Sequence, residues 1–190
     1  MKKIIEVRWH GRGGQGAVTA SKLLATSALA EDKYIQAFPE YGPERMGAPI
    51  QSFTRISDEP IKIHCHVTNP DMVVVLDPTL IGTVDITEGL PDEGIIVVNT
   101  NKTPAEIRKK LAVKGKKIFT IDASKIAQEE LGRPLPNTPM IGALIKATGL
   151  LKLKNVINDI KSKFSGKFSQ KVIEGNVKAI ERAYQEGKSE

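Results

Sequence analysis

A glycine-rich run near the N-terminus contains the first residues whose types and spacing could bind a ligand. Gly11, Gly13 and Gly16 satisfy the spacing G-x-G-x-x-G, and the run lies between a predicted strand and a predicted helix. Glycines permit a tight turn and a close approach of a ligand, while the N-terminus of the following helix presents unpaired N–H groups and a partial positive charge. Arg12 could add a full charge. The run therefore predicts a turn that binds an anion.

Three interpretations of this turn stay open from the residues alone. A dinucleotide site needs an acidic residue at the end of the second strand, about 20 residues further on, to bind the ribose hydroxyls. Here the second strand runs into Pro39, and Glu40 falls beyond it in a loop. A different anionic ligand therefore fits better than a dinucleotide. The third interpretation is a purely structural turn or a contact with another subunit.

The loop after the second predicted strand holds further candidate residues. Tyr41, Glu44 and Arg45 could form hydrogen bonds or a charge-assisted contact at the edge where open α/β sheets bind ligands. An equally weighted alternative is a surface turn in which Glu44 and Arg45 pair with each other. Gln15 adds an amide donor and acceptor to the same neighbourhood. The candidate cofactor-binding residues are Gly11, Arg12, Gly13, Gly14, Gln15, Gly16, Tyr41, Glu44 and Arg45.

A histidine pair raises the question of a metal site. His64 and His66 are two residues apart on a predicted strand, so their side chains would share one face. Cys65 would point to the other face, and His10 is the only other histidine in the chain. Because no second pair of ligands is evident, we expect a strand with an exposed histidine face and no metal site.

Polar residues at the ends of predicted strands are the remaining candidates. Asp77, Asn99 and Asp122 each follow an apolar strand, at the position where function tends to gather, but each also suits a helix cap. The sequence contains no G-x-S-x-G motif, no P-loop lysine and no nucleophile with an evident base. We therefore assign no catalytic residue to this chain.

The elements that must position these residues alternate between strands and helices. Two segments, Ile50–Ile56 and Ile61–Val67, alternate apolar and polar residues and predict an antiparallel hairpin. Continuous β-branched runs predict parallel strands that are buried on both faces. The other expected strands are Ile4–Trp9, Tyr34–Phe38, Met72–Leu76, Ile95–Val98 and Ile118–Ile121. The expected helices are Ala17–Leu29, Thr103–Val113, Ser124–Leu131, Asn137–Ala147, Asn155–Phe164 and Gln170–Gln185.

Together these elements predict a three-layer α/β fold. We expect an open, mostly parallel mixed sheet with an antiparallel hairpin, helices on both faces and a helical C-terminus. In the last third, the run Asn137-Thr138-Pro139 places capping residues before a proline at the start of a helix. No repeat or linker divides the sequence, so residues 1–190 are expected to form a single module.

Composition excludes several classes of protein. The chain has 190 residues and one cysteine, which excludes an internal disulfide, a four-thiolate zinc site and an iron–sulfur cluster held by this chain. It has no signal sequence and no apolar run long enough for a membrane span, so we expect a cytoplasmic protein that does not bind membranes. The net charge is +6. Lysines gather between Lys146 and Lys178 with almost no aromatic residues for base stacking, which favours a solvated helix face, or a patch for an anionic ligand or acidic partner, over nucleic acid.

A set of short runs carries a family resemblance. They are residues 8–17 (RWHGRGGQGA), 38–45 (FPEYGPER), 47–49 (GAP), 69–71 (NPD), 98–100 (VNT) and 137–144 (NTPMIGAL). Taken together and in this order, they closely resemble the gamma subunits of pyruvate:ferredoxin oxidoreductases, also called pyruvate synthases, in the 2-oxoacid:ferredoxin oxidoreductase family. The similarity covers nearly the whole chain.

The resemblance implies a subunit of a multi-chain enzyme. Such an enzyme oxidises pyruvate with coenzyme A, releases carbon dioxide and acetyl-CoA, reduces ferredoxin and can run in reverse. Thiamine diphosphate, Mg and the iron–sulfur clusters would lie on alpha, beta and delta partner chains, and this chain would bind none of them and be inactive alone. The resemblance places Gly11–Gly16 and the Tyr41–Arg45 loop at coenzyme A or at the subunit seam. The alternatives are a gamma subunit acting on another 2-oxoacid, such as a branched-chain one, an NAD-dependent Rossmann-type dehydrogenase, or a stand-alone binding or regulatory module.

Overall fold

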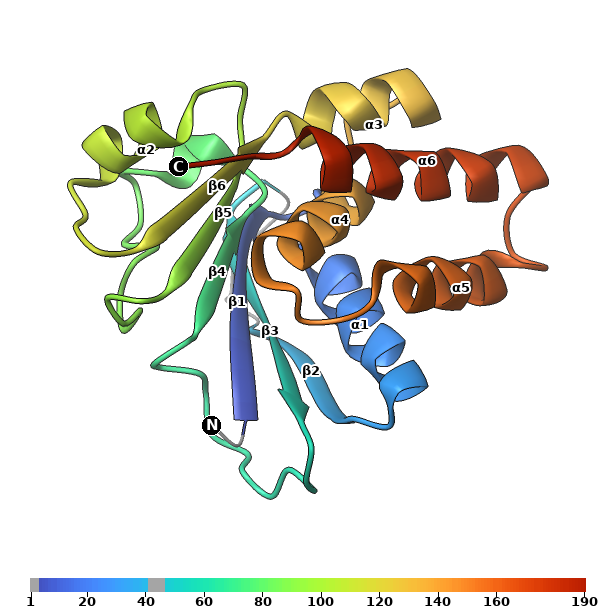
Figure 1. Ribbon diagram of the computed structural model, residues 1–190, viewed down its shortest axis with the longest axis horizontal. Coiled ribbons are helices and arrows are strands. Elements are labelled where there is room, and N and C mark those ends of the chain that lie inside the picture. Colours follow the sequence, from blue (N-terminus) through green and yellow to red (C-terminus); the bar gives the residue numbers. More distant parts are fainter. Residues whose placement is uncertain (1–3, 41–46) are drawn as a thin grey trace.

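A seven-stranded sheet with helices on both faces organises the chain (Figure 1). The computed structural model describes residues 4–40 and 47–190. The strand order is β2-β3-β1-β4-β5-β6-β7. The strands are β1 (Ile4–Arg12), β2 (Tyr34–Glu40), β3 (Pro49–Ser57), β4 (Met72–Val75), β5 (Ile95–Asn99), β6 (Lys117–Ile121) and β7 (Lys188–Ser189). The helices are α1 (Ala17–Ala28), α2 (Pro104–Leu111), α3 (Ala123–Leu131), α4 (Asn137–Thr148), α5 (Leu153–Phe164) and α6 (Gln170–Glu186), with short 3-10 helices η1 (Leu29–Glu31) and η2 (Pro78–Leu80).

The sheet is mixed, as predicted. Strands β1, β4, β5 and β6 run parallel to one another, β3 pairs antiparallel with both β1 and β2, and β7 pairs antiparallel with β6. The apolar runs Val73–Val75 and Ile96–Val98 are buried on both faces, because helices or loops cover each side of these parallel strands. The predicted fold class is confirmed.

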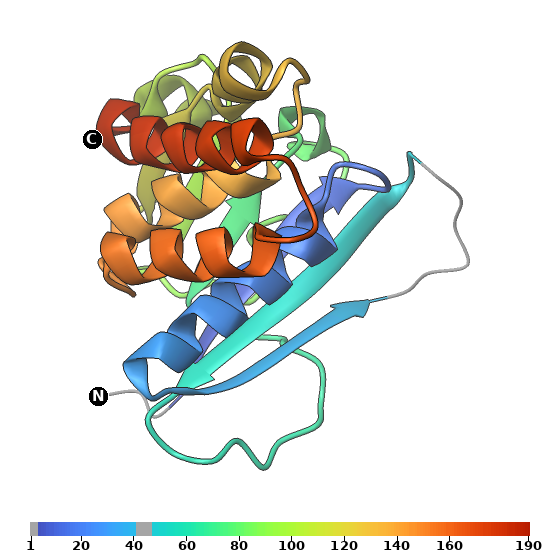
Figure 2. The same ribbon diagram turned by 90° about the vertical axis from the view of Figure 1, so that its right-hand side faces the viewer.

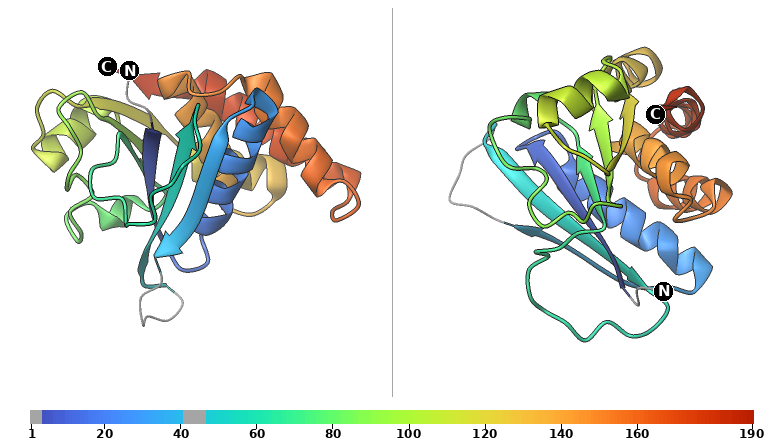
Figure 3. Two further views of the ribbon diagram at one scale, coloured as in Figure 1. Left: turned by 90° about the horizontal axis from the view of Figure 1, so that it is seen from below. Right: turned by 60° about the vertical axis from the view of Figure 1, so that its left-hand side comes forward.

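Two hydrophobic clusters lie on opposite faces of the sheet. On one face, Trp9, Val74 and Val97 pack against α1, α3, α4, α5 and α6. On the other face, Val75 packs in a cluster that contains Ile107 of α2. Figure 2 shows the larger helical layer from its outer side, and Figure 3 shows α2 on the opposite side of the sheet. Within the described residues, no helix is both long enough and apolar enough to cross a membrane.

The predicted hairpin partner Ile61–Val67 is wrong, because this segment forms no strand. Both backbone edges of β3 are already paired, since Ile56 lies opposite Ile5 on one side and Ile35 on the other. No edge remains for a third partner. The antiparallel pair that the sequence does form is β2 with β3, and the segment from 58 to 71 runs outside the sheet (Figure 2).

The predicted cap of the helix at residue 137 is also wrong. Neither Asn137 nor the preceding Pro136 makes a side-chain capping hydrogen bond to α4. The Thr138 hydroxyl instead donates to Asn176 Oδ1 at 2.8 Å and thereby connects α4 to α6. A polar residue before a helix is used here for contact between helices, which the local sequence pattern does not distinguish from capping.

Candidate functional site

The glycine-rich turn lies at the edge of the sheet where β1, β4, β5 and β6 end. After β1 the chain enters α1, which packs on the face of the larger helical layer. After β4 it turns the other way, and Ile81 packs on the face of α2. Open α/β sheets bind ligands at the point where consecutive connections leave toward opposite faces. The ends of β1 and β4 form such a point.

Two glycines of the turn have backbone conformations that favour glycine. Gly14 has φ +98° and Gly16 has φ +81°, both in the left-handed region. A Cβ atom on Gly16 would lie 2.8 Å from Nδ2 of Asn137, so no larger side chain fits without displacement. Gly16 is the N-cap residue of α1 and has no side chain, so α1 has no side-chain cap. Its first N–H groups are available to an anion.

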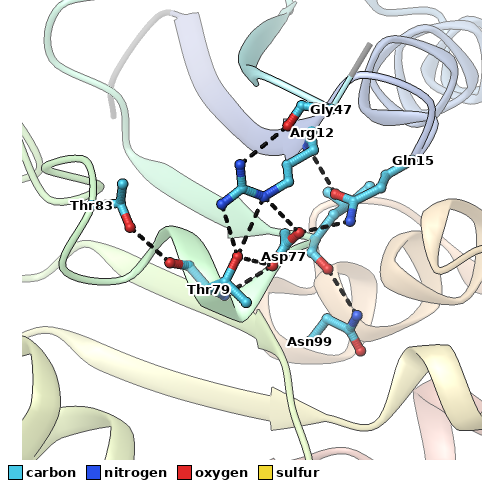
Figure 4. Close-up of polar contacts among 8 residues, drawn as sticks. Arg12, Gln15, Gly47, Asp77, Thr79, Thr83 and Asn99 are labelled. Carbon is cyan, nitrogen blue, oxygen red and sulfur yellow. Dashed lines mark hydrogen bonds and ion pairs between the residues drawn. The ribbon is translucent and has the colours of Figure 1, made fainter.

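Arg12, Gln15, Asp77 and Thr79 form a hydrogen-bonded cluster beside this turn, called here the Arg12 cluster (Figure 4). Arg12 Nε lies 3.2 Å from Asp77 Oδ2, and Arg12 Nη2 donates to Thr79 Oγ1 at 3.0 Å. Gln15 Nε2 donates to Asp77 Oδ2 at 2.8 Å, while Gln15 Oε1 accepts from the backbone N–H of Arg12, also at 2.8 Å. The Gln15 amide thus acts as both donor and acceptor within this cluster.

The electrostatics of the cluster keep Asp77 ionised. Burial alone would raise the pKa of Asp77, but hydrogen bonds from the Thr79 hydroxyl and N–H and from Gln15, with the charge of Arg12, outweigh burial and lower the pKa below its ordinary value. The side chain of Arg12 remains 32% exposed, against 11% for Asp77. The outward part of the guanidinium is therefore free to meet a ligand, although its charge is partly balanced by Asp77.

Two basic cavities continue this edge past the Arg12 cluster. One, of about 290 Å³, is lined by Thr79, Lys102 and Lys110, among others. The other, of about 190 Å³, is lined by Lys102 and Lys125, with Lys188 from β7. None of these lysines is among the candidate residues that the sequence predicts. Their only signal was that Thr79, Lys102 and Lys125 follow shortly after the strand ends at Asp77, Asn99 and Asp122.

The polar residues at those strand ends serve the fold. Asp77 accepts from the N–H of Thr79 at 2.9 Å and caps η2, and Asp122 accepts from the N–H of Lys125 at 3.1 Å and caps α3. Asn99 Nδ2 donates to the carbonyl of Leu76 at 2.8 Å. The capping alternative is thus confirmed for the two aspartates, and Asp77 additionally holds Arg12.

The candidate residues Tyr41, Glu44 and Arg45 lie outside the described residues. The ends of their loop are nevertheless at this edge. The N–H of Gly13 donates to the carbonyl of Ala48 at 3.0 Å, and Arg12 Nη1 donates to the carbonyl of Gly47 at 3.1 Å. The chain therefore leaves the loop directly beside the glycine turn.

The histidines do not form a metal site in the part of the chain that the structure describes, where no group of three or more His, Cys, Asp or Glu side chains could hold a metal ion. His64 and His66 lie in an exposed loop and not on a strand. His10 is buried and accepts a hydrogen bond from Arg8 Nε at 3.0 Å. Burial and the charge of Arg8 lower the pKa of His10 to about 3, so His10 is neutral at pH 7 and serves the core.

The sheet order does not favour the dinucleotide interpretation. Strand β3 lies between β1 and β2, so Glu40 at the end of β2 is two strand spacings, roughly 10 Å, from the end of β1. In a dinucleotide fold the strand that carries the ribose-binding acid neighbours the glycine turn. Glu40 is too far away to take that role.

Comparison with known proteins identifies the family. A model of the family described as pyruvate ferredoxin/flavodoxin oxidoreductase matches residues 6–186. The chain belongs to this family. The family resemblance that the sequence carries is thereby confirmed.

Individual relatives match the chain over nearly its whole length. The pyruvate/ketoisovalerate oxidoreductases common subunit gamma of Pyrococcus furiosus is 52% identical over 182 residues, which is 96% of each chain. The crystal structure of pyruvate oxidoreductase subunit PORC from Thermotoga maritima superposes with a TM-score of 0.88 at 48% identity and covers 99% of both chains. A 2-oxoglutarate:ferredoxin oxidoreductase from Magnetococcus marinus, solved with 2-oxoglutarate, coenzyme A and succinyl-CoA bound, shares the fold at 19% identity and a TM-score of 0.78, over 97% of this chain and 31% of that longer one.

Proposed function

We propose that this chain is the gamma subunit of a cytoplasmic pyruvate:ferredoxin oxidoreductase. The assembled enzyme oxidises pyruvate in the presence of coenzyme A to acetyl-CoA and carbon dioxide, and passes the electrons to ferredoxin. The observation that carries this proposal is the match to a relative named as a gamma subunit, at 52% identity over 96% of both chains. Alpha, beta and delta chains are the expected partners, and this chain is inactive without them.

Within the complex, the role of this chain is to receive coenzyme A at the edge that holds the Arg12 cluster. The first turn of α1 offers N–H groups and a partial positive charge to a phosphate. Arg12 adds a guanidinium that is about one-third exposed, and Lys102 and Lys110 line the neighbouring cavity. Arg45 is the second arginine of the proposal. These groups match a ligand with several phosphates.

The residues of this chain bind and orient, and the bond-breaking chemistry belongs to cofactors on the partner chains. Thiamine diphosphate, which the alpha and beta chains would hold, would supply the carbanion stabilisation that decarboxylation of a 2-oxoacid needs. Asp77, the carboxylate of the Arg12 cluster, is a weak base, because the hydrogen bonds from Thr79 and Gln15 and the charge of Arg12 lower its pKa. Positioning the thiol carrier is therefore the contribution of this edge.

Selection of the 2-oxoacid is assigned to the partner chains. The Pyrococcus furiosus relative is named as a common subunit of pyruvate and ketoisovalerate oxidoreductases. A gamma chain that serves two enzymes cannot by itself determine which 2-oxoacid is used. A branched-chain 2-oxoacid is therefore the second candidate substrate of a complex that contains this chain.

The test replaces Arg12 by glutamine in the assembled complex and measures steady-state kinetics with coenzyme A as the varied substrate. We expect Arg12→Gln to raise the KM for coenzyme A about tenfold, the usual effect of losing one charge-assisted phosphate contact, while the KM for pyruvate stays within about twofold. Lys22→Gln is the matched control, because Lys22 is exposed on α1 but lies beyond the first turn.

An intact Arg12→Gln complex with an unchanged KM for coenzyme A would remove Arg12 from the coenzyme A site. Oxidation of pyruvate or another 2-oxoacid by the single purified chain with NAD would contradict the subunit proposal itself. The same kinetic comparison with Arg45→Gln examines the loop residue independently of the Arg12 cluster.

A further inference from the structure

A separate cavity, of about 470 Å³, lies in the helical layer and shares no lining residue with the Arg12 cluster. It is bounded by α1, by the segment that joins α3 to α4, and by the connection between α5 and α6 (Figure 2). Its walls are largely apolar and include Leu23, Leu135, Phe164 and Val172. The volume is within the range of sites that hold a small ligand or one or two inserted side chains.

Two amide side chains, Asn137 and Asn176, line this cavity. Asn176 uses both ends of its amide: Oδ1 accepts from the Thr138 hydroxyl and Nδ2 donates to the carbonyl of Val172, each at 2.8 Å. Asn137 also lines the cavity and is 8% exposed, yet its side chain makes no hydrogen bond to any residue that the structure describes. The polar atoms of Asn137 are not among the buried unpartnered atoms of the described residues, so this amide is accessible and can form a hydrogen bond with water or with an occupant of the cavity.

The rim of the cavity is basic. Arg133, Lys163 and Lys167 line it, and no acidic residue does. Lys163 is paired with Asp159 at 2.8 Å, whereas Arg133 and Lys167 are exposed and have no ion pair within the described residues. The rim therefore complements an occupant that carries negative charge.

An exposed aromatic ring, that of Phe168, also lines the cavity. Phe168 is 48% exposed, and its ring centroid lies 5.0 Å from that of Phe164 inside the cavity. A large exposed phenylalanine beside unpaired cations is typical of a protein interface, where an apolar centre is surrounded by a charged rim.

We propose that this cavity is a docking site for an acidic segment of a partner subunit. The segment inserts a large apolar side chain beside Phe164 and Phe168, places carboxylates against Arg133 and Lys167, and accepts or donates a hydrogen bond at the Asn137 amide. The proposal rests on the proposed function, because it requires that the chain assembles with other subunits. It adds a specific surface for that assembly, and one of its lining residues, Asn137, also packs on Gly16 of the glycine turn.

The first experiment measures the affinity of the purified chain for the complex of its remaining subunits. We expect Phe168→Ala to weaken assembly at least tenfold, and the double change Arg133→Glu with Lys167→Glu to weaken it at least a hundredfold with reduced salt dependence. Lys109→Glu with Lys114→Glu is the matched control, since both lysines are exposed on the α2 side and carry the same change in charge. The control should assemble within about twofold of the wild type.

A second variant separates docking from folding. Asn137→Ala removes no hydrogen bond to a described residue, so its thermal unfolding midpoint should fall only slightly, through lost packing on Gly16, whereas its affinity for the partner subunits should drop at least fivefold. A loss of thermal stability without a change in affinity would make Asn137 a structural residue and contradict this part of the proposal.

A photoreactive benzophenone side chain at position 168 identifies the occupant in the assembled complex. The proposal predicts a crosslink to one acidic peptide of a different subunit. Crosslinks only to a second copy of this chain, to nucleic acid or to lipid would overturn it, as would equal assembly of the pocket variants and the control. A wild-type chain that assembles with no other subunit would contradict the proposed function itself. Assembly of the wild type with unchanged assembly of the pocket variants would contradict the docking site alone.

Discussion

At the scale of single residues, the Arg12 cluster shows how one carboxylate positions an arginine at a site that is already electropositive. The guanidinium of Arg12 and the N-terminus of α1 lie on the same turn and repel each other. Asp77 offsets this repulsion, and its contacts with Arg12, Gln15 and Thr79 fix the direction of the arginine. Asp77 is therefore a positioning residue, and removing it should affect both stability and ligand binding.

We predict that Asp77→Asn lowers the free energy of unfolding by about 1–3 kcal/mol at pH 7, since charge-assisted hydrogen bonds from three partners are weakened. Urea unfolding of the isolated chain measures this. Asp122→Asn is a suitable comparison, because Asp122 accepts one capping bond at 3.1 Å and should cost less. Equal losses for the two variants would show that the Arg12 cluster adds nothing beyond capping.

The Asp77 carboxylate also makes the free energy of unfolding depend on pH, in a direction set by its lowered pKa. The pKa of Asp77 is lowered in the folded state from its ordinary value of 3.8, so its stabilising contribution is fully present above pH 3.8. The contribution is lost as the pH falls through the folded-state pKa. The difference in unfolding free energy between the wild type and Asp77→Asn should therefore shrink in acid. A difference that grows as the pH falls below 3.8 would contradict this assignment.

At the scale of elements, helices α4 and α6 approach each other closely at Gly142. A Cβ atom on Gly142 would lie 2.2 Å from the carbonyl oxygen of Ile180, so the two helices pack at a distance that only glycine allows. This contact holds α4 against the sheet, where its residues Asn137–Ile145 are all buried. The N-terminus of the same helix carries Asn137, which packs on Gly16 of the glycine turn.

We predict that Gly142→Ala destabilises the chain by about 2–4 kcal/mol, because the backbones of α4 and α6 must separate. Gly149→Ala is the matched control. Gly149 ends the same helix at φ +64° with no atom within 4 Å of an added Cβ, so only backbone strain of about 1 kcal/mol is expected. Chemical denaturation of both variants measures the two losses of unfolding free energy. A Gly142→Ala variant no less stable than Gly149→Ala would show that the helices separate without cost.

The sequence predicted elements whose signals are local and failed where the outcome depends on distant neighbours. Runs such as Ile95–Val98 indicate buried parallel strands by themselves, and the glycine turn is evident from its spacing. The segment Ile61–Val67 has a strand-like alternation, but whether it pairs depends on β3 having a free edge, which β1 and β2 remove. Lys102 and Lys110 could not be assigned to the candidate site, because only the strand order brings them beside Thr79.

At the scale of the whole molecule, two basic surfaces contribute to the net charge of +6. One is the edge where the parallel strands end, with Arg12, Lys102 and Lys110. The other is the rim of the cavity in the helical layer, with Arg133 and Lys167. A chain that belongs to the pyruvate ferredoxin/flavodoxin oxidoreductase family over residues 6–186 thus presents one basic surface suited to a phosphorylated carrier and another suited to an acidic protein.

The most direct test of the central claim is backbone hydrogen exchange of the assembled complex with and without coenzyme A. We predict slower exchange on addition of coenzyme A in the peptide that spans Gly11 to Thr19, because the phosphates would accept hydrogen bonds from the glycine turn and from the first turn of α1. Exchange in α5, on the far side of the helical layer, should not change. Unchanged exchange between Gly11 and Thr19 in a complex whose pyruvate oxidation requires coenzyme A would contradict the account.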